Sequence, residues 1–192
     1  DFPFHIKIDM HGKVMDINSV GYEDFKGQLK HQCSAHPKVD AKTQELFIFA
    51  YDVAEPVLHF SVLNQYKRII STMKVPITSP RMIHDFQITQ NHVIFPDLPL
   101  EFDPADAVKK NRFVFHYDNT KPCRYGIMIR YKTNAKDIKW FDVPAHYVFH
   151  YVNSWEEYDE NKDLNIIMFA VVWESLNVDF QKFDNLWESG NH

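Results

Sequence analysis

The stretch Met82-Ile83-His84-Asp85-Phe86-Gln87-Ile88-Thr89 decides the fold, because it places a histidine at the head of a segment in which apolar and polar residues alternate. A period of two residues is the pattern of a half-buried β-strand. Two other histidines, His36 and His150, stand in comparable segments earlier and later in the chain. The sequence therefore raises the question of whether three histidines from three strands meet at one metal ion.

The composition is that of a globular chain. The 192 residues are 45% hydrophobic, 24% charged and 15% aromatic, which gives ample material for a core or an apolar pocket. A net charge of -5 argues against a nucleic-acid-binding protein, which would carry a basic face. The longest apolar run, 166–173, is far shorter than the roughly 20 residues of a membrane span. The length allows one domain over residues 1–192, or part of a larger one.

The two cysteines, Cys33 and Cys123, are too few for a disulfide framework or a cysteine-based zinc site. A reducing compartment is the simpler interpretation. The first residues, Asp1-Phe2-Pro3-Phe4, contain neither an initiator methionine nor a targeting pattern. We therefore expect the chain to be a segment of a longer protein.

Short apolar or alternating runs separated by polar turns predict an all-β fold. The run 46–51 is apolar on both faces, which predicts a strand that is buried on both sides or faces a ligand. One short helix is expected within 105–110, and an amphipathic turn or frayed end after residue 177. The predicted strands are 4–8, 14–17, 46–51, 57–62, 69–75, 84–89, 92–95, 113–116, 125–131, 138–143, 147–152 and 165–173.

The spacing of the three histidines indicates a repeated unit. His36 and His84 are 48 residues apart, and His84 and His150 are 66 residues apart. A propeller blade of four strands takes about 40–50 residues. The first interval therefore fits one blade and the second fits one blade with an insertion at 97–111. Equivalent positions on successive blades point toward one central axis, which would bring the three side chains together.

Histidine is a suitable ligand type for such a site, because neutral imidazole binds iron, zinc, copper and nickel. Pro37 biases the preceding His36 toward an extended conformation. Alternation places Phe86 and Ile88 on the same face as His84, so we expect the ligand to be flanked by apolar groups in a dry cavity.

A zinc-binding helix is the rival interpretation. His146 and His150 are separated by four positions and would share one face of a helix. The glutamate of the zincin motif is missing between them, and the intervening residues are β-branched or aromatic, which favours a strand. The other histidines have no partner pattern and are expected to be ordinary surface or hydrogen-bonded residues: His5, His11, His31, His59, His92, His116 and His192.

The three histidine contexts together resemble the carotenoid cleavage oxygenase family, also called the carotenoid oxygenase or retinal pigment epithelial membrane protein family. The matching motifs are Gly27-Gln28-Leu29 with Ala35-His36-Pro37-Lys38-Val39-Asp40, then Met82-Ile83-His84-Asp85-Phe86, then Phe149-His150 with Asn153-Ser154-Trp155-Glu156-Glu157. Weaker similarities are Cys123-Arg124-Tyr125-Gly126-Ile127 and Lys139-Trp140-Phe141-Asp142-Val143-Pro144. Their order agrees with the family across nearly all of residues 1–157.

The resemblance implies a seven-bladed β-propeller, of which this chain would be a central fragment of roughly two to three blades. It implies one Fe(2+) per full-length subunit, held by four histidines, three of which carry over onto His36, His84 and His150. No segment after His150 matches the motif of the fourth histidine ligand, and the residues around His192 do not resemble that motif. The family's glutamates that accept from the imidazole N–H groups have no matching position either. One would fall just before Asp1, and Glu156 and Glu157 belong to a different motif.

The activity that the resemblance implies is a non-heme Fe(II) dioxygenase. It would cleave a C=C bond of a carotenoid, apocarotenoid or related conjugated substrate with O2 to give two carbonyl products. The expected partners are an apolar polyene or stilbene-like substrate and O2, no nucleic acid is expected, and peripheral membrane contact for substrate uptake stays open. Two alternatives also stay open: a non-catalytic β-propeller binding protein and a retinoid-isomerase-type member of the same family. The compartment is open between cytoplasm and plastid.

Overall fold

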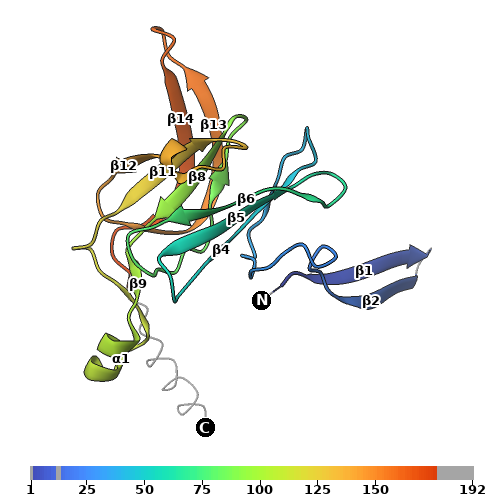
Figure 1. Cartoon of the computed structure of the whole chain (residues 1–192), viewed down its shortest axis with the longest axis horizontal. Helices are drawn as coiled ribbons and strands as arrows, with labels where there is room; N and C mark the ends of the chain where they lie inside the picture. The colour runs from blue at the N-terminus through green and yellow to red at the C-terminus, as the bar shows by residue number, and fades with distance from the viewer. Residues whose placement is uncertain (1, 12–13, 177–192) are drawn as a thin grey trace.

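The computed structural model of the chain describes residues 2–11 and 14–176. Its architecture is almost entirely antiparallel β-structure (Figure 1). The all-β prediction is therefore confirmed. The amphipathic turn or frayed end predicted after residue 177 lies outside the described residues.

The first four-stranded sheet is an antiparallel meander in the order β3-β4-β5-β6. Strand β4 is buried on both faces, as its two apolar sets predict, with Phe47, Ile48 and Phe49 almost fully enclosed. The bounds are β3 (Lys38–Val39), β4 (Leu46–Tyr51), β5 (Val57–Leu63) and β6 (Ile69–Pro76).

The second four-stranded sheet has the order β12-β11-β8-β7 and carries an insertion between β8 and β11. The sheet strands are β7 (Gln87–Ile88), β8 (His92–Asp97), β11 (Arg124–Ile129) and β12 (Lys139–Asp142). The insertion contains β9 (Leu100–Phe102), α1 (Pro104–Lys110) and β10 (Phe115–Tyr117), and a 3-10 helix η1 (Ala135–Asp137) precedes β12. The insertion predicted at 97–111 is thus present, although it extends to residue 117.

Helix α1 begins one residue before the range 105–110 that is expected from the sequence. Asp103 is the N-cap, and its side chain accepts a hydrogen bond from the backbone N–H of Asp106 at 2.9 Å. Pro104 at the first helical position needs no hydrogen-bond partner for its nitrogen. Asn111 ends the helix in the left-handed conformation.

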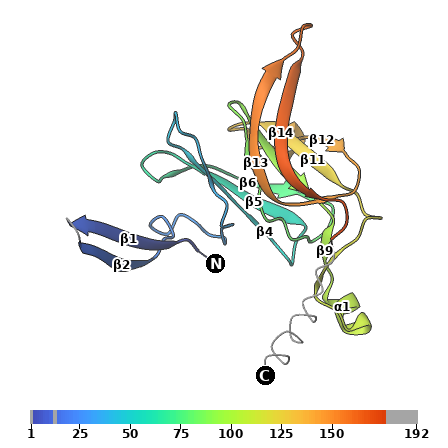
Figure 2. The same cartoon turned by 180° about the vertical axis from the view of Figure 1, so that it is seen from behind.

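Two hairpins complete the described chain. Strands β1 (Phe4–His11) and β2 (Val14–Tyr22) pair with each other and lie apart from the four-stranded sheets in both views (Figures 1 and 2). Strands β13 (Tyr147–Tyr158) and β14 (Leu164–Trp173) form a long hairpin that projects from the body (Figure 1). No helix among the described residues is long and apolar enough to cross a membrane.

The main hydrophobic core lies between the two four-stranded sheets. It draws Phe49 and Phe60 from the first sheet and Phe95 from the second, and the rings of Phe60 and Phe95 meet edge to face with centroids 5.1 Å apart. A second cluster joins the second sheet to β13 through Tyr125 and Tyr151. These two interfaces fix the three units relative to one another.

Candidate metal centre

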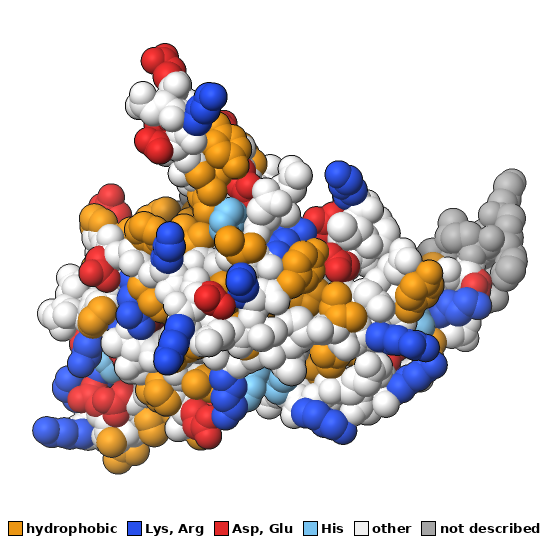
Figure 3. All heavy atoms as spheres, turned by 45° about the horizontal axis from the view of Figure 1, so that its top comes forward, with side chains coloured by type: hydrophobic (Ala, Val, Ile, Leu, Met, Phe, Trp, Pro, Cys, Tyr) orange, Lys and Arg blue, Asp and Glu red, His pale blue; other side chains and the backbone are white. Residues whose placement is uncertain are grey.

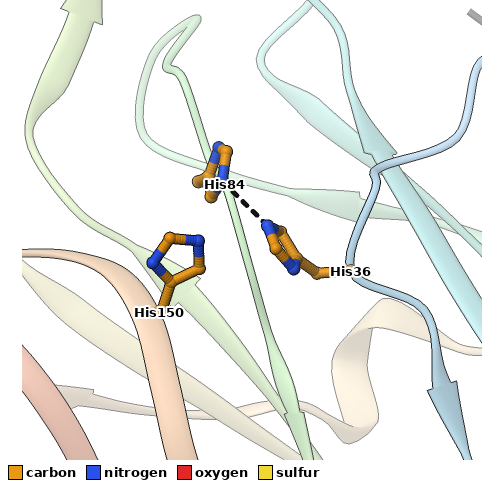
Figure 4. A group of neighbouring side chains, drawn as sticks. All are labelled: His36, His84 and His150. Carbon is orange, nitrogen blue, oxygen red and sulfur yellow. Dashed lines mark hydrogen bonds between the residues drawn. The ribbon is translucent and has the colours of Figure 1, made fainter.

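The structure brings together the three histidines that the sequence singles out (Figure 4). His36 precedes the edge strand β3, His84 precedes the edge strand β7, and His150 lies inside β13. Each therefore comes from a different segment of the chain, and in Figure 4 the three rings point toward one another. His36 and His84 are half-buried and His150 is exposed.

The distances suit a shared ion. The Nε2 atoms of His36 and His84 are 2.9 Å apart. Two histidine nitrogens that each bind one metal ion at about 2.1 Å, with a right angle at the ion, would be about 3.0 Å apart. The ring centroid of His150 lies 4.8 Å from the ring centroid of His36 and 5.1 Å from that of His84. One ligand atom from each of the three residues lies within 4.8 Å of the others, so the donor set fits a metal ion.

The electrostatic surroundings favour the ligand form of the histidines. Burial is the largest cause that lowers the pKa of His36; Asp85 opposes this shift, while His150 and Lys38 add to it. Burial also lowers the pKa of His84, and His36 and His150 lower it further. Both shifts favour neutral imidazole, which is the form that binds a metal.

Ser34 connects two of the ligand-bearing segments, and its role was not predicted from the sequence. Its hydroxyl donates to the carbonyl oxygen of His84 at 2.9 Å and accepts from the backbone N–H of His36 at 3.2 Å. A serine two residues before a histidine carries no distinguishing signal, because such serines occur in many turns.

Asp85 connects all three segments. Its carboxylate is 2% exposed and accepts from Lys38 Nζ at 2.7 Å, from the backbone N–H of Phe86 at 2.8 Å and from the backbone N–H of Tyr151 at 3.1 Å. Sequence reasoning missed this group as well. The available signal was an acidic residue beside one histidine motif and a lysine inside another.

Two predictions about the surroundings of His84 are wrong. His84 does not begin a strand, because β7 covers only Gln87–Ile88. Phe86 does not line the site, since it is fully buried in the main core with its ring 5.0 Å from that of Phe49. The aromatic ring that packs against His84 belongs to Phe149, at a centroid distance of 5.6 Å.

The rival zinc helix is also wrong. His150 lies in a strand, and His146 precedes that strand with its Nε2 2.9 Å from the hydroxyl of Tyr125. Among residues 2–11 and 14–176, His36, His84 and His150 are the only group of three potential ligands that lies close enough to hold an ion. The C-terminal His192 lies outside the described residues.

Comparisons with known proteins identify the family. The family model described as "Retinal pigment epithelial membrane protein" matches residues 2–191. A relative from Pisum sativum, named carotenoid 9,10(9',10')-cleavage dioxygenase 1, is 37% identical over 96% of this chain and 34% of its own length. A relative from Arabidopsis thaliana, named a chloroplastic 9-cis-epoxycarotenoid dioxygenase, is 34% identical over 88% of this chain and 29% of its own length. The chain thus spans about a third of the length of these relatives.

Solved structures match the fold. A lignostilbene dioxygenase from Pseudomonas brassicacearum has a TM-score of 0.66 and 27% identity, over 79% of this chain and 32% of that one. A cobalt-substituted apocarotenoid oxygenase from Synechocystis has a TM-score of 0.63 and 22% identity, over 83% of this chain and 34% of that one. The four-stranded sheets and these matches confirm the predicted fold class, part of a β-propeller. The chain therefore belongs to the carotenoid cleavage oxygenase family, also named the retinal pigment epithelial membrane protein family.

Proposed function

We propose that this chain is the part of a non-heme Fe(II) dioxygenase that supplies three of the iron ligands, His36, His84 and His150. The full-length enzyme would cleave a C=C bond of a carotenoid, apocarotenoid or stilbene-like substrate with O2. The observation that carries the proposal is the meeting of three histidines from three separate segments in a chain 37% identical to a named carotenoid dioxygenase.

The donor set favours a metal ion that keeps free coordination positions for further ligands. Three neutral imidazoles leave the +2 charge of an ion uncompensated and leave coordination positions for further ligands. The fourth histidine that the family resemblance implies is not among the described residues. Iron(II), when bound, supplies the redox chemistry by which O2 adds across the double bond.

The side chains of this segment have three tasks in the proposed reaction. The histidines hold the ion, the ring of Phe149 shields one side of His84 from water, and the buried core behind the site fixes the positions of the strands. No acid or base is assigned. Addition of both atoms of O2 across one C=C bond, with cleavage of that bond, gives two carbonyl groups without net gain or loss of a proton.

Iron analysis of the full-length protein tests the ligand set. Wild-type protein is expected to bind one iron per subunit, and His84→Ala to lose both iron and cleavage activity. His92→Gln is the matched control, because His92 is another half-buried histidine that lies outside the group and pairs with Glu156 at 3.0 Å. Full iron occupancy in His84→Ala would remove that residue from the ligand set.

Product analysis under oxygen-18 gas tests the reaction class. A dioxygenase places label in both carbonyl products, provided that they are analysed before exchange with water. A non-catalytic binding protein gives no products, and an isomerase gives an unlabelled product of unchanged chain length. Incubation with a carotenoid, an apocarotenoid and a stilbene in parallel would identify the substrate class.

A further inference from the structure

The carboxylate of Asp85 lies at the junction of the three segments that carry the histidines. Each of its contacts to another segment involves a residue within two positions of a ligand in sequence. Lys38 follows His36 by two positions, and Tyr151 directly follows His150. Asp85 itself directly follows His84. One buried side chain therefore connects the three segments that carry the imidazoles.

The hydrogen bonds to Asp85 are charge-assisted, because they are made to an ionised carboxylate. A carboxylate removed from water is costly unless it is paired, and Asp85 is paired with the Lys38 ammonium at 2.7 Å and with two backbone N–H groups. Hydrogen bonds to an ionised carboxylate are roughly twice as strong as neutral ones. The lysine side chain is 20% exposed, whereas the aspartate side chain is 2% exposed.

The local structure of β13 is shaped around this contact. The pairing of β13 with β14 is irregular on both sides of Tyr151, between Val148 and Tyr151 and between Tyr151 and Asn153. Such bulges bend a strand and re-aim its side chains. The irregular region contains His150, and it is here that the backbone N–H of Tyr151 meets Asp85 at 3.1 Å.

We propose that Asp85 is a positioning residue which, together with Lys38, holds the three histidine-bearing segments at the separation that one metal ion requires. This inference rests on the proposed function, since it assumes that the histidines bind a metal. Asp85 is not itself a ligand in the proposal, because its carboxylate is engaged by the three donors named above.

Glu156 provides a matched comparison within the same molecule. It also joins β13 to the second sheet, accepting from the side chain of Thr89, from Asn91 and from His92. It lies six positions beyond His150, up to about 20 Å along an extended strand. A contact that only holds two sheets together is thus available for comparison with one that lies beside the ligands.

The test uses the full-length protein loaded with cobalt(II) as the probe. The dissociation constant is measured by chelator competition, the visible cobalt spectrum reports the ligand geometry, and thermal unfolding of the metal-free protein reports stability. The variants are Asp85→Asn, Lys38→Met and Lys38→Arg, with Glu156→Gln as the control.

Asp85→Asn and Lys38→Met are expected to weaken cobalt binding by about 10-fold or more and to change the visible spectrum, as losses of groups that orient metal ligands do. Lys38→Arg retains the charge and is expected to restore most of the affinity. Glu156→Gln is expected to lower the unfolding temperature while leaving affinity and spectrum as in the wild type. If Asp85→Asn does not fold, Lys38→Met alone tests the inference, because the partly exposed lysine tolerates replacement more easily.

Wild-type affinity and spectrum in both Asp85→Asn and Lys38→Met would overturn the inference while leaving the proposed function in place. An equal loss of affinity in Glu156→Gln would also overturn it, because general loosening of the sheets would then explain the effect. Failure of the wild-type protein to bind cobalt would overturn the proposed function and this inference together.

Discussion

Glu156 connects β13 to the turn between β7 and β8. Its side chain accepts hydrogen bonds from Thr89, Asn91 and His92. Burial opposes its ionisation, but the hydrogen bonds from Thr89, His92 and Asn91 together outweigh burial and lower the pKa of Glu156 to about 2. The sequence places this residue in a Trp-Glu-Glu motif without indicating what it contacts.

Glu156→Gln is expected to lower the free energy of unfolding by about 1–2 kcal/mol near neutral pH, because hydrogen bonds to an ionised group are lost. The depressed pKa makes this contribution fully present above about pH 4.5, the ordinary pKa of glutamate. It is lost as the pH falls toward the folded-state pKa of about 2. Urea unfolding of wild type and variant between pH 6 and pH 3 measures it. A difference that stays constant, or grows, as the pH falls would contradict the role assigned to this carboxylate.

Gly126 is a second residue whose identity the structure requires. A Cβ atom at this position of β11 would lie 2.8 Å from Ile138 Cγ2 and 2.8 Å from Trp140 Cζ3. Trp140 is held in place, since the guanidinium of Arg124 lies 4.1 Å from the centroid of its ring.

Gly126→Ala is therefore expected to destabilise the protein by about 1–3 kcal/mol through overpacking. Thermal unfolding measures the effect, and Trp140→Leu in the Gly126→Ala background should recover part of the loss, because the shorter side chain leaves room for the added methyl group. An unfolding temperature equal to that of the wild type in Gly126→Ala would show that the two side chains move aside freely.

At the scale of the elements, Arg81 joins the connection between β6 and β7 to the second sheet and its insertion. The side chain is fully buried and donates to Asp97 at 2.7 Å, to Glu101 at 2.7 Å and to the carbonyl of Pro122 at 2.9 Å. Asp97 ends β8, and Glu101 lies in β9. The segment that leads to the histidine motif is thus anchored by one cation.

Arg81→Leu is expected to cost about 3–5 kcal/mol of stability, because it leaves the buried carboxylate of Glu101 without its cation and leaves Asp97 with Arg124 alone. Arg68→Leu is the control, since Arg68 is exposed and surface substitutions usually change stability by less than about 0.5 kcal/mol. Both variants are compared by urea unfolding. Equal stability of the two variants would mean that the buried cation does not hold these elements together.

Local pattern predicted the elements well where the strands build the core. Strand β4 is as predicted, because its two alternating sets are both apolar and both are buried. Of the predicted strand 84–89 only Gln87–Ile88 forms a strand, because side chains bind the backbone before it instead of a neighbouring strand. Asp85 binds the N–H of Phe86, and Ser34 binds the carbonyl of His84. Polar side chains compete with sheet formation in this way.

The candidate site was predictable only in part for a related reason. The histidines could be selected by motif and spacing, but the contact between Asp85 and Tyr151 joins residues 66 positions apart. Such a contact depends on how two sheets pack, and no local pattern records it. The ligand assignment of His36, His84 and His150, and residues 1–192 as a partial propeller domain, stay predictions.

At the scale of the whole molecule, the last described strand has an apolar edge. Within the described residues β14 pairs only with β13. Its exposed side chains include Phe169, Val171, Val172 and Trp173. Figure 3 shows hydrophobic side chains along this projecting hairpin. Unpaired strand edges and contiguous apolar surface promote association between chains.

The 192-residue chain expressed alone is therefore expected to self-associate, whereas the full-length protein at the same concentration is expected to associate less. Light scattering after size-exclusion chromatography, over a range of protein concentrations, measures the molar mass of each. The double variant Phe169→Lys with Val171→Lys should shift the isolated chain toward the monomer, because charges on an edge strand oppose pairing. A monomeric wild-type chain at every concentration would contradict this expectation. If the double variant associates as strongly as the wild-type chain, the surface responsible for association lies elsewhere than on β14.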